Sequence, residues 1–217
     1  MTDWQKHLGG PAWKLPHTSS NKNKLYQEKC IKSNSRVSKV LRITGEDIDS
    51  LLISNTKLKV VYLYRDPRGI INSRLKLRYR PVWNVTMGTV KQIADGLCKK
   101  MEMDSKVIFK LIEIKYPKRI IRVAYEDIVK NPTQSTKDIF RFLEVNISEN
   151  YLSKVSDMGK HDGISNREWN SVFRANGLST AMKWNQELSN LDKQAIDQSC
   201  ALIYKRFGYK VSSYDDT

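Results

Sequence analysis

KVVYLYRDPRGIINSR, residues 59–74, is the stretch that decides the fold. Its first six residues are almost all apolar or aromatic, which is typical of a strand buried in a parallel sheet. Asp66 and Pro67 then suit the N-cap and the first position of a helix. Ile70, Ile71 and Leu75 continue that helix as its apolar face. The stretch therefore predicts a buried strand that leads directly into a helix.

Basic and hydroxyl side chains gather where this strand is expected to end. Ligands bind open α/β sheets at the carboxyl edge, and a helix that starts there presents N–H groups and the positive end of its dipole. Arg65 and Arg68 can each grip a phosphate through two N–H groups, and Ser73 adds a hydroxyl donor further along the helix. The residues favour equally a phosphate monoester site and a surface turn that only caps the helix.

The remaining sequence predicts further strands and helices in alternation. Strands are expected over residues 36–43 and 119–125, and Tyr125–Asp127 should end the second strand and cap a loop. Helices are expected over residues 44–52, 90–116, 133–143 and 191–207, the last capped by Asn190 and ended by Gly208, while residues 156–180 have the composition of a loop. This order predicts an α/β layered fold with a parallel sheet.

Composition excludes several classes of protein. The 217 residues carry 38 Lys and Arg against 23 Asp and Glu, a formal net charge of +15, and show neither a membrane span nor a secretory signal at residues 1–14. The charge suits a lysine-rich surface as well as an anionic partner. Cys30, Cys98 and Cys200 are too few and too widely spaced for a zinc site, so we expect no metal. They suit three free thiols, or one disulfide and one free thiol in an oxidising compartment.

Residues 59–74 resemble the 3′-phosphate-binding motif of sulfotransferases that use 3′-phosphoadenosine 5′-phosphosulfate (PAPS). The resemblance is greatest to the Golgi carbohydrate sulfotransferases of the N-acetylglucosamine/galactose/keratan 6-O type, although Tyr64 and Gly69 replace the usual Val and Ala. It continues in order over residues 36 to 209, with further matches at residues 122–132, 140–143 and 184–188, at Cys200 and at Gly208-Tyr209.

The resemblance implies transfer of a sulfuryl group from PAPS to a carbohydrate hydroxyl, with a 6-O position of a glycan expected. It implies a three-layer P-loop-like fold, with a central parallel sheet flanked by helices, in a domain over residues 36–210. Residues 1–35 would be an irregular segment and residues 211–217 a tail. The expected partners are a glycan acceptor and an adenine nucleotide, with no specific nucleic acid and no metal.

The resemblance also assigns individual residues. Arg65 and Ser73 match the family's ligands of the cofactor's 3′-phosphate, Arg68 is expected beside them, and Arg174 matches an Arg in a loop that closes over the nucleotide. Cys98 and Cys200 lie where the family has cysteines, which suits a disulfide and free thiols equally. No motif identifies the catalytic base, and His161 is expected to be an ordinary surface residue.

The family's N-terminal strand–loop–helix, which holds the 5′-phosphosulfate, is not found in this sequence, and neither is a membrane anchor. We therefore expect the C-terminal two-thirds of such an enzyme, which would not transfer sulfate by itself. It would be a fragment, a mispredicted gene product, a splice form or an inactive paralogue. A full-length protein should be held at the Golgi membrane by its anchor and face the lumen, with Asn84 and Asn146 as glycosylation sites, whereas the chain as given should stay cytosolic.

One alternative belongs to a different functional class. A non-catalytic basic module would bind nucleic acid or sulfated glycans through its charge alone. A nucleic-acid binder should show a recognisable fold motif or interleaved aromatic residues, and the sequence has no RNA-binding, zinc-finger or helix-turn-helix signature. A steep loss of affinity with salt, together with indifference to a 3′,5′-bisphosphate nucleotide, would favour this alternative.

Overall fold

A computed structural model describes residues 28, 31–41, 43–78, 87–157 and 177–212. The chain separates into two units, Met1–Arg42 and Ile43–Thr217. In the first unit, the strand predicted to begin at Arg36 does not form over residues 36–41. Val37 and Leu41 are 90% and 81% exposed, so their alternation does not mark a buried face. A strand needs a neighbour to pair with its N–H and C=O groups, and none pairs with these residues.

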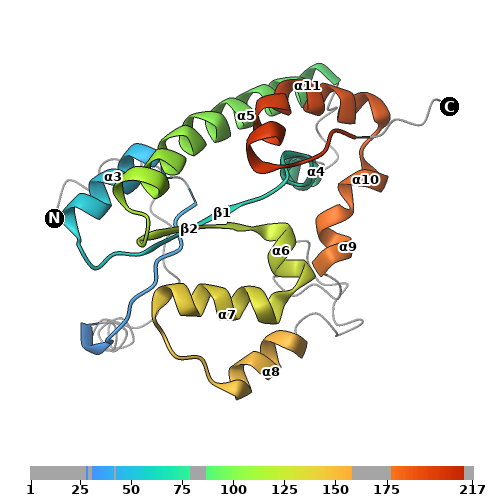
Figure 1. Ribbon diagram of the computed structural model, residues 1–217. Helices are drawn as coiled ribbons and strands as arrows, with labels where there is room; N and C mark the ends of the chain where they lie inside the picture. The colour runs from blue at the N-terminus through green and yellow to red at the C-terminus, as the bar shows by residue number, and fades with distance from the viewer. Residues whose placement is uncertain (1–27, 29–30, 42, 79–86, 158–176, 213–217) are drawn as a thin grey trace. The chain divides into compact units, whose positions relative to one another are not determined.

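The second unit contains two parallel strands and nine helices within the described residues (Figure 1). The strands are β1 (Val60–Tyr64) and β2 (Ile120–Ala124). The helices are α3 (Gly45–Ser54), α4 (Pro67–Arg78), α5 (Met87–Lys110), α6 (Tyr125–Lys130), α7 (Pro132–Leu143), α8 (Glu149–Asp157), α9 (Gly177–Met182), α10 (Trp184–Glu187) and α11 (Asn190–Phe207). A π-helical segment, Leu111–Lys115, extends α5. The strand–helix–strand order confirms a parallel α/β arrangement.

The two strands pair in register from Val60 with Ile120 to Tyr64 with Ala124. Val60 and Tyr62 pack on the side covered by α3 and the end of α5, in a cluster centred on five buried residues: Ile48, Leu52, Ile108, Leu111 and Ile120. On the other face, Val61 and Leu63 are 36% and 55% exposed. The expectation of a strand buried on both faces was therefore wrong, because successive side chains alternate between faces and the described helices bury only one face at these positions.

Several predicted helix ends are confirmed. Thr44 caps α3 through a reciprocal pair of hydrogen bonds with Asp47. Gly208 ends α11 in the left-handed region, at φ 79°, a conformation that glycine adopts without strain. The N-cap of α11 is Ser189 rather than the predicted Asn190, because the Ser189 hydroxyl accepts the Asp192 N–H.

Two predicted loops are partly helical. Tyr125, Glu126 and Asp127 form the first turn of α6 instead of a loop. The stretch predicted as a loop over residues 156–180 contains the end of α8 and most of α9, while its centre lies outside the described residues. Gly, Ser and Asn lower helix propensity, but tertiary contacts override that preference at the ends of this stretch.

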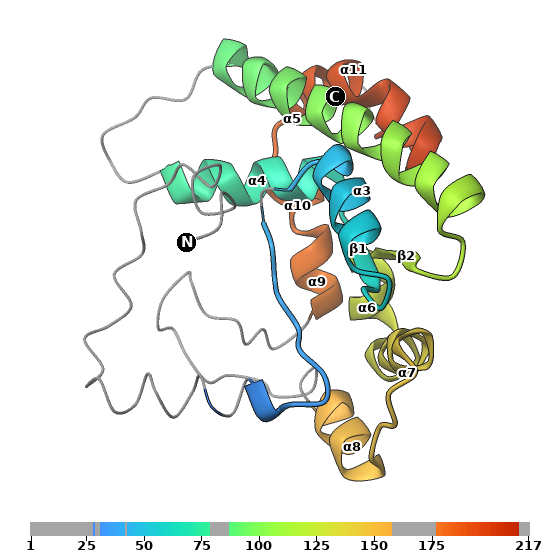
Figure 2. The same cartoon turned by 90° about the vertical axis from the view of Figure 1, so that its left-hand side faces the viewer.

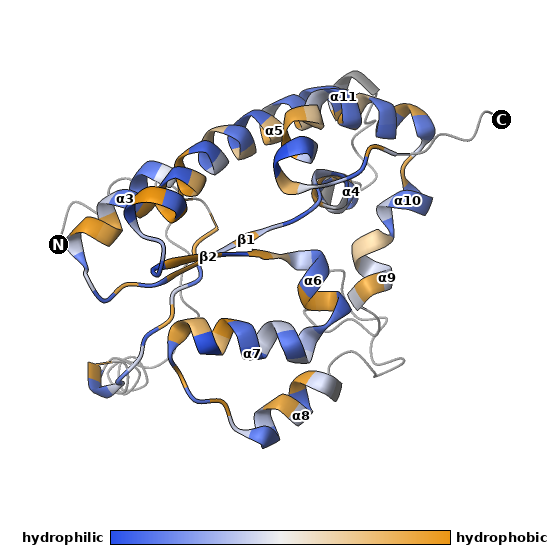
Figure 3. Ribbon diagram, viewed as in Figure 1, coloured by the Kyte–Doolittle hydropathy of each residue, from blue (hydrophilic) through white to orange (hydrophobic). Residues whose placement is uncertain are grey.

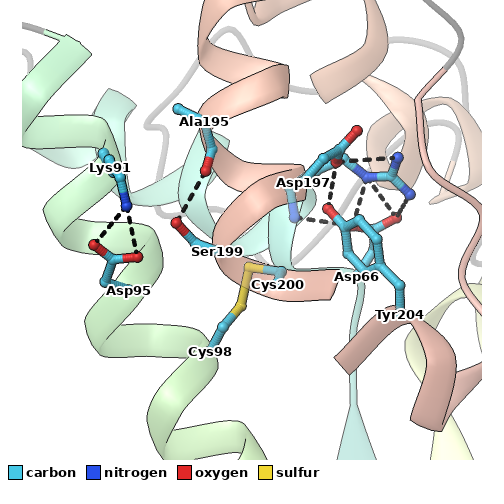
Figure 4. Close-up of a disulfide and its surroundings, with 10 residues drawn as sticks. Asp66, Lys91, Asp95, Cys98, Ala195, Asp197, Ser199, Cys200 and Tyr204 are labelled. Carbon is cyan, nitrogen blue, oxygen red and sulfur yellow. Dashed lines mark hydrogen bonds and ion pairs between the residues drawn. A yellow bond between two sulfur atoms is a disulfide. The ribbon is translucent and has the colours of Figure 1, made fainter. Parts of the chain in front are cut away.

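The main core lies between the long helices. Helices α5 and α11 run side by side in both views (Figures 1 and 2), and α4 and α10 complete the cluster. Both long helices mix hydrophobic and hydrophilic segments (Figure 3), as expected for helices with one face in a core. Cys98 of α5 and Cys200 of α11 form a disulfide inside this core, and both are almost fully buried (Figure 4). None of the helices in the described part of the chain is long and apolar enough to cross a bilayer.

Candidate functional site

The carboxyl ends of β1 and β2 bring Arg65 and Tyr125 together. Tyr64 and Ala124 are register partners, so the next residue of each strand leaves the sheet at the same edge. The Arg65 guanidinium lies over the Tyr125 ring, with its carbon 4.5 Å from the ring centroid. Its Nε is buried and has no hydrogen-bond acceptor among the residues that the structure describes. A buried donor without an acceptor is uncommon in a folded protein, so this edge offers a hydrogen bond that a bound anion would complete.

Gly69 gives the Arg65 side chain room against α4. A methyl group on Gly69 would lie only 3.0 Å from Arg65 Nε and 3.1 Å from Nη2, closer than side chains normally approach. Ser73 is exposed and lies one turn beyond Gly69. Helical residues four apart share a face, and their side chains lean toward the helix N-terminus. Gly69 and Ser73 therefore lie on one face of α4, and the Arg65 guanidinium lies beside Gly69.

The N-terminus of α4 is capped by the protein itself. The Asp66 carboxylate accepts the Arg68 N–H at 2.9 Å, and the Asp66 carbonyl accepts the Ile70 N–H at 3.1 Å. Pro67 has no N–H to offer. The helix terminus therefore has fewer N–H groups for a ligand than the sequence suggested. An anion at this edge would depend mainly on the Arg65 and Ser73 side chains.

The structure places Arg68 inside the protein, 4% exposed. Its Nε and Nη2 contact both oxygens of Asp66, at 3.0 Å and 2.7 Å to the nearer atoms. Its Nη1 donates to Ser212 Oγ at 2.9 Å and lies 3.8 Å from Asp197 Oδ1. Burial alone would lower the pKa of Arg68, but the hydrogen bonds that it donates to Asp66, together with the negative charges of Asp66 and Asp197, outweigh burial and raise the pKa. The donors of Arg68 are thus committed to protein groups.

Two aromatic rings and a second carboxylate complete this buried cluster. The Arg68 guanidinium stacks on Trp184 and Tyr204, 4.0 Å and 4.8 Å from their ring centroids. Tyr204 donates to Asp197 Oδ1 at 2.7 Å, and burial and this bond raise the pKa of Tyr204. Asp66, Asp197 and Tyr204 lie together in Figure 4. Sequence reasoning missed Asp197 and Tyr204, because nothing in the chain links α11 to a turn more than a hundred residues earlier.

The other predicted site residues have different placements. Arg174, Asn84 and His161 lie outside the described residues. Asn146 is exposed between α7 and α8, as an acceptor of a glycan must be. Among the residues that the structure describes, no group of three or more His, Cys, Asp or Glu side chains could hold a metal ion. Of the four predicted binders, the structure thus describes Arg65, Arg68 and Ser73, and it buries Arg68.

Comparisons with known proteins identify the family of the chain. Residues 31–208 match the family described as "Sulfotransferase domain". Carbohydrate sulfotransferase 1 of Mus musculus is 26% identical over 206 residues, which cover 88% of this chain and 49% of the mouse protein. Human carbohydrate sulfotransferase 3 is 22% identical over 213 residues, 87% of this chain and 41% of the human protein. The chain thus spans about half the length of the curated relatives it matches, and no solved structure matches it.

Proposed function

Because the chain belongs to the sulfotransferase domain family, a family of transferases, we propose that it binds the nucleotide of PAPS. The whole protein's reaction is then transfer of a sulfuryl group from PAPS to a hydroxyl of a carbohydrate acceptor. The similarity to carbohydrate sulfotransferases supports a glycan as the acceptor. The finer expectations belong to the same proposal: a 6-O position, a three-layer P-loop-like fold, and a glycosylated protein of the Golgi lumen.

The observation that carries the proposal is the buried Nε of Arg65, which no acceptor in the described part of the chain engages. A guanidinium that presents two N–H groups matches two oxygens of a phosphate, and a partly buried charge makes that contact stronger. The Tyr125 ring lies against the guanidinium before any ligand arrives, and Gly69 leaves room for the guanidinium beside α4. A preorganised donor loses less entropy on binding than a mobile one. We therefore assign the 3′-phosphate to Arg65.

Ser73 and Arg68 have different parts in this proposal. Ser73 lies one helical turn beyond Gly69 and supplies a neutral hydroxyl donor to the same phosphate. Arg68 donates its hydrogen bonds to Asp66 and Ser212. Its part in nucleotide binding is therefore indirect, because it stabilises the turn from which Arg65 extends.

Calorimetry with adenosine 3′,5′-bisphosphate tests the assignment. Arg65→Ala should weaken binding about 10- to 100-fold, because a charge-assisted hydrogen bond contributes about 1.5–3 kcal/mol. Arg65→Lys should recover little, since an ammonium lacks the planar pair of donors. Arg141→Ala is the matched control, because it removes the same charge from an exposed position on α7. An unchanged affinity in Arg65→Ala, with the fold intact, would overturn the assignment.

A further inference from the structure

Glu126 joins three separate segments at the carboxyl edge of the sheet. It is half-buried in the first turn of α6. Its Oε1 accepts the backbone N–H of Asp66 at 3.0 Å, and its Oε2 accepts the hydroxyl of Tyr209 at 3.1 Å. The carboxylate thus links the β1–α4 turn to the segment that follows α11.

The hydrogen bond to the Asp66 N–H acts on the short turn that carries Arg65. Arg65 and Asp66 are the two residues between the last residue of β1 and the first of α4. The Asp66 N–H belongs to the peptide that joins it to Arg65, so a hydrogen bond there fixes the backbone from which the Arg65 side chain extends. The Tyr125 ring, one residue before Glu126, contacts the Arg65 guanidinium itself. Adjacent residues of α6 therefore hold the backbone and the side chain of the same arginine.

Tyr209 contacts Glu126 at the carboxylate oxygen opposite to the one that binds Asp66. Its ring packs against Tyr64, the last residue of β1, with centroids 6.4 Å apart, and against Phe207 at 6.5 Å. Burial and the neighbouring Glu126 carboxylate raise the pKa of Tyr209, so its hydroxyl stays a donor across the physiological range. Glu126 has both oxygens engaged and is oriented by groups that do not belong to α6.

From these contacts we propose that Glu126 is a positioning residue, which orders the β1–α4 turn and so holds Arg65 ready for the nucleotide phosphate. The inference rests on the proposed function in one respect only, the identity of the anion. Under this proposal the Glu126 carboxylate favours phosphate binding, although its negative charge by itself should oppose it. By Coulomb's law alone, removing a negative charge there should strengthen binding of a phosphate.

The two explanations therefore predict opposite changes in phosphate affinity when Glu126 is replaced, and binding measurements can distinguish them. Three variants are compared by calorimetry with adenosine 3′,5′-bisphosphate. Glu126→Ala removes both the charge and the acceptor of the Asp66 N–H. Glu126→Gln removes the charge but keeps an amide oxygen that can accept this N–H. Asp127→Ala removes the neighbouring charge from an exposed side chain of the same helical turn.

Glu126→Ala should bind the nucleotide roughly two- to tenfold more weakly than the parent chain, the range expected for loss of one hydrogen bond that orders a ligand-binding group. Glu126→Gln and Asp127→Ala should bind as tightly as the parent or more tightly. Tighter binding by Glu126→Ala, or equal losses in Glu126→Ala and Glu126→Gln, would overturn the positioning role. Thermal unfolding of each variant is measured as a control, so that affinities are compared only between variants that are folded at the temperature of the calorimetry.

Amide hydrogen exchange separates this inference from the proposed function. The Asp66 amide should exchange faster in Glu126→Ala and at the parent rate in Glu126→Gln, whether or not any nucleotide binds. Relaxation of the Arg65 Nε–H should show a more mobile guanidinium in Glu126→Ala. A parent chain that fails to bind the bisphosphate would count against the proposed function, and these two measurements would then decide the inference alone. Unchanged exchange and unchanged Arg65 mobility in Glu126→Ala would refute it.

Discussion

Replacing Arg68 by alanine should destabilise the protein far more than replacing an exposed arginine. The guanidinium places a positive charge beside two buried carboxylates, Asp66 and Asp197, which are 5% and 6% exposed. Without Arg68, both carboxylates would remain in a poorly solvated region that lacks this counter-charge. The stacking of the guanidinium on Trp184 and Tyr204 would be lost as well.

The magnitude follows from what remains in the cluster. Breaking a buried ion pair by removing one partner costs about 3–5 kcal/mol, because the remaining charge is uncompensated. For a folded unit of this size, that free energy lowers Tm by about 6–20 °C. Arg68→Lys keeps the charge but cannot contact both Asp66 oxygens with a planar pair of donors, so its cost should be smaller but measurable.

Thermal and urea unfolding of Arg68→Ala, Asp197→Asn and the double variant test this explanation. If uncompensated charge causes the loss, Asp197→Asn should recover part of it in the Arg68→Ala background and destabilise the parent chain. Such a departure from additivity is expected for residues in contact. Nucleotide affinity, measured well below Tm, should change less in Arg68→Lys than in Arg65→Lys. An unchanged Tm in Arg68→Ala together with a tenfold or greater loss of affinity would refute the reasoning and make Arg68 a direct ligand.

Three further outcomes are expected. Replacing Cys98 and Cys200 by alanine should lower the free energy of unfolding by about 2–5 kcal/mol in urea, because the disulfide joins residues 102 positions apart; no loss would contradict a stabilising bond. Burial raises the pKa of Glu187, but the hydrogen bonds from Lys76 and Asn72 and the charges of Lys76 and Lys183 together outweigh burial and hold the pKa below its ordinary value. The stability that the ionised Glu187 contributes is therefore present above the unfolded pKa and is lost as pH falls through the folded pKa. Acid unfolding of Glu187→Gln should lack that step, and identical acid transitions would exclude it. Expressed behind a signal peptide, the chain should show a glycosidase-sensitive gel shift that Asn146→Gln abolishes or reduces; a shift unaffected by this change would place the glycan elsewhere.

Much of the fold could be predicted from local pattern. The continuous apolar run of β1, the Asp-Pro pair at the start of α4 and the glycine after α11 each reflect a physical preference that acts within a few residues. The prediction failed for residues 36–41, where alternating side chains indicated a strand but the described structure has no pairing partner for them. It also failed at Tyr125–Asp127, which form a helical turn. In both cases the deciding contacts are not local.

The candidate site divides in the same way. The sequence by itself determined that Arg65 follows a strand and that Ser73 lies on the helix that comes next, because strand ends and helical spacing are set by local sequence. Only the tertiary structure decided which arginine has its donors engaged. Arg65 and Arg68 are three residues apart and have the same chemistry, yet Asp197 and Tyr204 of α11 contact Arg68, while the Arg65 guanidinium stacks on Tyr125 of α6 and its Nε has no acceptor among the described residues. The availability of a charge depends on burial and on partners distant in the sequence, and those arise only when the helices pack.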